Sequence, residues 1–159
     1  MSMDALNIEL DLSTALPADS GILEIRLPGS DKPTGWKIEL AGPAHAKTIA
    51  LGQDLARERL RKEAQAEAAQ VNGRKYKPDL ESVDERNLRN VTRIVQRIVG
   101  WSMHGHAGPI FKQVSPEPIA FSEKTAVDLL MRPDMGWVLG QIADYLTSEA
   151  AFTQGSVQS

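Results

Sequence analysis

His104 and His106 are the residues whose types and spacing come closest to a metal site. Two imidazoles separated by one glycine could bind one metal ion, with His45 or an acid as a third ligand. A metal site needs three or four converging ligands, and no acid or cysteine lies at ligand spacing beside this glycine-flanked pair. A surface loop is the preferred interpretation, and we expect neither a bound metal nor a cofactor.

The carboxylates offer a second route to chemistry, because two neighbouring acids can divide the roles of general acid and general base. Asp128 and Asp134 flank a break before the last expected helix, whereas Asp54, Asp79 and Asp84 are scattered along the chain. Nothing in the sequence brings two of them together. Helix capping and solubility are the preferred explanations for these acids.

Patterns typical of nucleophilic catalysis and of phosphate binding are missing from the sequence. No serine stands in a nucleophile elbow, no glycine cluster has phosphate-loop spacing, and the chain has no cysteine. The basic segment 74–77 contains a tyrosine and could touch a phosphate backbone, but the net charge of −3 provides no positive field for nucleic acid. We therefore expect a protein that is not an enzyme and does not bind nucleic acid.

Alternating apolar and polar residues predict strands near the start of the chain. Residues 22–27 and 36–40 alternate with a period of two, and the connection between them is dense in turn-forming residues. Segment 7–12 shows the same alternation and could add to the edge of this hairpin. An antiparallel β-hairpin or small sheet is the structure expected for residues 1–43.

A long charged helix is expected to follow. Residues 45–71 lack proline, contain only Gly52 among the glycines, and are rich in good helix formers. Glu58 and Lys62 have the i,i+4 spacing of a helix-stabilising ion pair. The apolar stripe is weak, which is typical of a helix that is solvated or that awaits a partner. Its members are Ile49, Leu55, Leu60, Ala64 and Ala68. With the basic loop after it, this helix makes up residues 44–78.

The next helix has the best amphipathic pattern in the chain. Ser82 and Glu85 form a capping-box pattern at its start. The apolar positions that follow recur on one helical face, so we expect them in the core. These candidate core residues are Leu88, Val91, Val95 and Ile98.

The remainder of the chain predicts a long loop and two helices. Segment 100–120 is rich in glycine and proline, which favours an irregular loop. Ser122 can cap a helix over residues 123–131, and a final amphipathic helix follows Pro133. The fold class is therefore α+β, with a small N-terminal antiparallel sheet followed by about four helices. We expect one folding unit, with a helical core over 79–152 and a flexible tail over 153–159.

Three tryptophans stand at the edges of apolar elements. Packing in the core or at a hinge is the first interpretation, and projection as binding anchors is the alternative. Two of these tryptophans are candidate interaction residues, together with apolar positions of the helices. The candidates are Leu55, Leu60, Trp101, Trp137 and Phe152.

Three blocks of sequence occur in a recognisable order. Pro-Thr-Gly-Trp-Lys-Ile-Glu-Leu-Ala-Gly-Pro at 33–43 precedes the long charged helix, Ile-Val-Gly-Trp follows at 98–101, and Ile-Ala-Phe-Ser-Glu at 119–123 precedes the last helices. This order, over roughly residues 22–152, resembles the tail assembly chaperones of long-tailed bacteriophages and prophages. Segment 102–117 is longer than the linker of that family, and the expected strand at 7–12 is additional.

The resemblance implies a chaperone that binds the long, helical tape measure protein, keeps it soluble and helps to recruit tail tube subunits. It also implies self-association, residence in the cytoplasm of the bacterial host and absence from the mature virion. Neither a signal peptide nor a membrane span is expected from the sequence. Two alternatives remain, a structural virion component such as a tail or head–tail connector subunit, and a small metal-dependent enzyme that uses the loop with His104 and His106.

Overall fold

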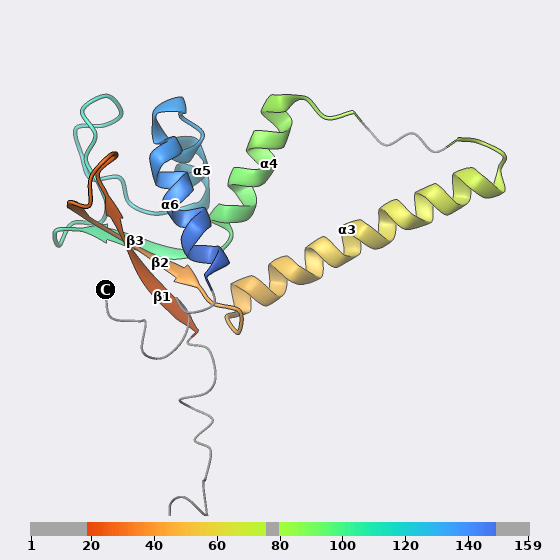
Figure 1. The fold of residues 1–159 in the computed structure, drawn as a ribbon, viewed down its shortest axis with the longest axis horizontal. Coiled ribbons are helices and arrows are strands. Elements are labelled where there is room, and N and C mark those ends of the chain that lie inside the picture. Colours follow the sequence, from red (N-terminus) through yellow and green to blue (C-terminus); the bar gives the residue numbers. More distant parts are fainter. Residues whose placement is uncertain (1–18, 76–79, 149–159) are drawn as a thin grey trace, which may run out of the picture.

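The computed structural model describes residues 19–75 and 80–148, and within them the fold is α+β. A three-stranded antiparallel sheet has the strand order β1-β2-β3, and helices cover one of its faces (Figure 1). The predicted fold class is confirmed. The strand expected at 7–12 lies outside the described residues. No described helix has the length and apolar character needed to cross a membrane.

The predicted hairpin consists of β1 (Ser20–Arg26) and β2 (Pro33–Ala41), which pair antiparallel with Leu23 opposite Ile38. The alternation of β2 matches its burial, since the three apolar residues at 36, 38 and 40 are buried and Lys37 between them is exposed. These buried residues form the floor of the core.

The third strand, β3 (Ile98–Met103), corrects the sequence prediction, which continued the preceding helix through Ile98 and began a loop at 100. β3 pairs antiparallel with β2, placing Ile38 opposite Trp101. Arg97 holds the corner before it, because its backbone and its guanidinium each bond to Ala41 over 2.7 Å. Burial lowers the pKa of this guanidinium. The regions expected over 1–43 and 79–152 therefore share one sheet.

The long helix is confirmed as α3 (Ala46–Val71), in which His45 is the N-cap and its imidazole accepts a hydrogen bond from the Lys47 amide over 3.0 Å. None of its 26 residues is buried. α3 runs away from the sheet and the other helices, so most of its length lies outside the packed part of the molecule (Figure 1).

Helix α4 (Val83–Val95) begins with the predicted capping box, in which Ser82 and Glu85 exchange hydrogen bonds of 3.1 and 3.4 Å. Val91 and Val95 are buried, as predicted, and so is Ile98 in β3. Leu88 is 46% exposed, so its prediction as a core residue is wrong. It continues the same helical face toward the start of α4, where the cluster of buried residues no longer extends.

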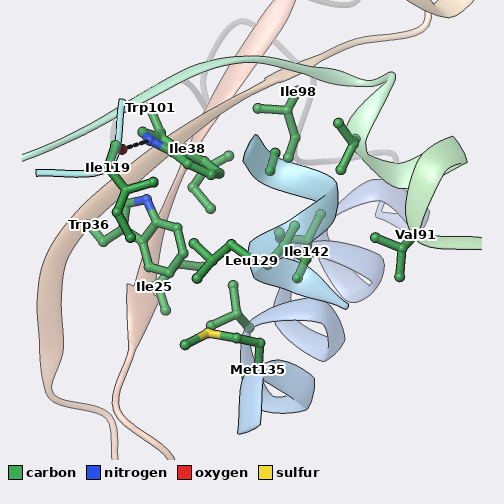
Figure 2. Packing of buried hydrophobic residues seen from close by; sticks show 14 of the residues in the cluster. Ile25, Trp36, Ile38, Val91, Ile98, Trp101, Ile119, Leu129, Met135 and Ile142 are labelled. Carbon is green, nitrogen blue, oxygen red and sulfur yellow. Dashed lines mark hydrogen bonds between the residues drawn. The ribbon is translucent and has the colours of Figure 1, made fainter. Parts of the chain in front are cut away.

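The core is closed by α5 (Glu123–Leu130), the short 3-10 helix η1 (Pro133–Met135) and α6 (Gly136–Thr147). As predicted, Ser122 caps α5 by accepting a hydrogen bond from the Thr125 amide over 3.1 Å. Figure 2 shows Leu129 and Ile142 of these helices facing the strand residues across the core. We call the sheet with α4, α5 and α6 the packed body.

Two further contacts connect distant segments of the packed body. Gln141 of α6 pairs its side-chain amide with both backbone groups of Arg26 at the end of β1, over 2.8 and 2.9 Å. The rings of Trp36 and Trp101 meet edge to face with their centroids 5.2 Å apart. Phe111 packs edge to face on Trp36 and Phe121 on Trp101, with centroids 5.8 and 5.1 Å apart, so aromatic packing ties the long segment before α5 to the sheet.

Candidate interaction surface

The histidine pair lies in a tight turn at the end of β3. Met103 and His106 exchange backbone hydrogen bonds of 3.1 and 2.8 Å, and the two residues between them, His104 and Gly105, have φ angles of 48° and 80°. Positive φ at both central residues is the geometry of a hairpin turn that glycine favours. The His104 ring lies against Gly35 of β2, where any side chain would overlap it. Its observed contact is therefore a packing contact.

No group of three or more histidine, aspartate or glutamate side chains converges on one point within residues 19–75 and 80–148. Of the two acids considered for acid–base chemistry, Asp134 forms a salt bridge with a neighbouring arginine. Asp134 accepts two hydrogen bonds from Arg132, at 3.1 and 3.0 Å. These bonds lower the pKa of Asp134 and raise that of Arg132. Asp134 thus serves an ion pair at the start of η1.

A groove of about 560 Å³ lies between the segment before α5 and α5 itself. Its floor is apolar, with Ile119 and Leu129, and its charged groups are Asp128 and Arg132. No histidine lines it to activate the hydroxyls of Ser115 and Thr125.

The tryptophans differ from the binding anchors considered from the sequence. Trp101 is only 9% exposed, and its indole nitrogen donates to the carbonyl oxygen of Ile119 over 2.8 Å. Its prediction as an interaction residue is therefore wrong, because β3 carries it into the core. Trp137 is half-buried against the core and donates to the carbonyl oxygen of Asp134 over 2.8 Å. Phe152 lies outside the described residues.

The leucines of α3 point in different directions. Leu55 is half-buried and lines a hollow of about 260 Å³ between α3 and α4, together with Leu51. Leu60 is 64% exposed. Five residues along a helix turn the side chain by well over a quarter turn, so Leu55 and Leu60 do not share a face. The single apolar stripe predicted for this helix is therefore wrong, and α3 has two separate faces.

The inner face of α3 is attached to the packed body by ion pairs. Glu58 accepts from Lys62 on its own helix at 3.2 Å and from Arg93 of α4 at 3.4 Å. The hydrogen bond from Lys62 is the main cause that lowers the pKa of Glu58. Near the start of α3, Lys47 reaches Glu123 of α5 at 3.3 Å. Such exposed pairs fix orientation more than they stabilise, since solvent screens them.

The outer face of α3 carries three exposed apolar side chains, which we call the outer stripe: Ile49, Leu60 and Val71. Their exposed fractions are 51%, 64% and 80%. Successive members are eleven residues apart, close to three helical turns, so all three lie along one side of α3. The eleven-residue spacing is visible in the sequence, but the sequence analysis placed Leu55 and Leu60 on one face and so did not identify this set.

No protein-family model, no curated protein and no solved structure matches this chain.

Proposed function

We propose that this protein is a tail assembly chaperone of a long-tailed phage or prophage, which binds the helical tape measure protein during assembly and catalyses no reaction. The observation that carries the proposal is α3, a 26-residue helix without one buried side chain. A helix of this length costs conformational entropy to order, and α3 buries no side chain in the free chain to offset that cost.

The packed body supports this role by holding α3 at one end. The N-cap at His45 and the ion pairs with α4 and α5 fix the first half of α3, while its second half extends away from the body (Figure 1). Recognition of one helix by another uses an apolar face such as the outer stripe. The identity of the client comes from the resemblance described above, which also suggests tail tube protein as a further partner.

This function is tested by following the protein through assembly in cells that produce the phage. Antibody capture before tails are complete is expected to recover the tape measure protein with this chain, and mass spectrometry of purified mature particles is expected to detect none of it. Presence in particles at the level of a tail subunit would show a structural virion component instead. Stoichiometric zinc in the untagged protein would favour the alternative of a metal-dependent enzyme that uses the turn with His104 and His106.

A further inference from the structure

We propose that the outer stripe of α3 is the client-binding face and that it receives an amphipathic helix with acidic residues beside its own apolar stripe. This inference rests on the proposed function and specifies the surface and the chemistry of the partner. Three features of α3 support this assignment: the shape of its apolar face, the cations around Leu60 that form no salt bridge, and the poor fit of a second copy.

The shape of the outer face fits a helix. From Ile49 to Val71 the stripe spans roughly 33 Å of helix axis, which a loop or a short strand does not cover. One turn to either side of Leu60 stand Ala56 and Ala64, both exposed. Small residues beside a large one let a second helix approach closely and leave a ridge for it to pack against.

The charges beside Leu60 favour an acidic partner. Four cations and one acid occupy positions 57–62, in a chain whose net charge is −3. Arg57 pairs with Asp54, and Lys62 pairs with Glu58. Among the described residues neither Arg59 nor Arg61 forms a salt bridge, and Arg61 acts on Glu58 only as one of the weaker charges that lower its pKa. The two arginines lie on either side of Leu60 around the helix. Two carboxylates flanking the apolar stripe of a client helix would complement them.

Farther along the same face the charge changes sign. Glu63 and Glu67 follow Leu60 toward Val71, and neither forms an ion pair among the described residues. A complementary helix therefore carries acids opposite Leu60 and a basic residue opposite Glu67. This order of charges fixes one direction and one register for the client helix.

A second copy of α3 fits this face less well. Two copies that meet antiparallel at Leu60 would place Arg59 and Arg61 of one chain beside the same residues of the other. Like charges at such a contact are destabilising. Glu63, an unpaired acid one turn from Leu60, lies on the same side as Arg59 and leaves the repulsion on the side of Arg61 in place. An acidic client helix removes this repulsion, so we assign the face to the client.

The test measures binding of the tape measure protein of the same phage to full-length wild-type protein and to three variants. The stripe variant combines Ile49→Gln, Leu60→Gln and Val71→Gln, and the charge variant combines Arg59→Glu with Arg61→Glu. The control variant combines Arg74→Glu with Lys75→Glu, which makes the same change in charge at exposed positions just beyond α3. All substituted side chains are exposed, and circular dichroism verifies that the helical content is unchanged.

The stripe variant is expected to bind roughly tenfold or more weakly than wild type, because buried apolar contacts dominate such interfaces. The charge variant is expected to bind more weakly at low salt and to lose most of the salt dependence, whereas the control binds as wild type does. Wild-type affinity in the stripe variant would overturn this inference and leave the proposed function intact.

Two other outcomes separate the remaining possibilities. Failure of the wild-type protein to bind the tape measure protein would overturn the proposed function, and the client assignment with it. In sedimentation velocity, a wild-type dimer that becomes monomeric in the stripe variant would show that a second copy occupies the face. That result would overturn the assignment to the client.

Discussion

Trp101, Ile119 and Gly108 lie close together in the packed body. The Trp101 indole nitrogen donates to the Ile119 carbonyl oxygen over 2.8 Å. Gly108 is buried beside this bond, and a Cβ there would overlap the Ile119 carbonyl oxygen and lie 2.7 Å from the indole nitrogen. Only glycine fits between them. This contact fastens the segment before α5 onto the sheet.

Gly108→Ala is therefore expected to destabilise the fold by about 2–4 kcal/mol, through overpacking and weakening of the Trp101 bond. The matched control is Gly140→Ala in α6, where a Cβ meets nothing within 4 Å. There alanine is expected to raise the stability by about 0.5–1 kcal/mol because of its higher helix propensity. Urea unfolding of both variants measures the difference, and equal midpoints would contradict this account of Gly108.

At the same scale, the sequence could not assign the role of the histidine pair. His104-Gly105-His106 has a composition that suits ligands, but the turn places the His104 ring on Gly35 of β2. That contact joins residues far apart in the chain, so no local pattern reveals it. Gly35 in β2 and Gly105 in the turn both have a positive φ, a conformation that glycine favours, and this preference is the part that local reasoning can supply.

At the scale of elements, the sequence predicted correctly the helices that begin with a capping residue. Ser82 with Glu85 and Ser122 are capping residues that the structure confirms, and both helices start where these residues indicate. β3 was missed because it contains Gly100 and depends on pairing with β2, which is distant in sequence. Leu88 was misplaced for a related reason, since helical periodicity gives the face of a residue but not where the core ends.

The same substitution, leucine to alanine, is expected to have different effects in a helix packed in the core and in the exposed helix α3. Leu129→Ala in α5 removes a buried side chain and is expected to cost about 2–5 kcal/mol of stability. Leu60→Ala in α3 removes an exposed one and is expected to change stability by less than about 0.5 kcal/mol. Thermal or urea unfolding distinguishes them. A large loss for Leu60→Ala would mean that α3 packs against the body in the free protein.

Helix α3 is also expected to open more readily than the packed body. With no buried side chain, its backbone hydrogen bonds in the second half, residues 60–71, are protected by helix formation alone. Hydrogen exchange with mass spectrometry is expected to show fast exchange there and slow exchange in β2 and α5. Protection in residues 60–71 equal to that in α5 would contradict a solvated α3.

At the scale of the whole molecule, the chain combines a well-packed body with one helix that the body barely uses. The sequence indicated a charged, weakly amphipathic helix that is solvated or awaits a partner, but it left open whether this helix projects from the body or packs on it. The sequence did not predict the outer stripe, because it does not distinguish Leu55 from Leu60, which are both apolar residues of the same helix. Only the contact of α3 with α4 decides that Leu55 points inward and Leu60 outward. The surface therefore follows from tertiary structure.

The central claim, that this chain keeps a helical client soluble, is tested most directly by the solubility of the tape measure protein of the same phage. The tape measure protein is produced alone, with the wild-type chain and with the stripe variant, and its soluble fraction is measured after centrifugation. The account predicts a mostly insoluble client alone, a mostly soluble one with the wild-type chain, and little rescue by the stripe variant. A soluble fraction that does not change when the wild-type chain is present would contradict the claim.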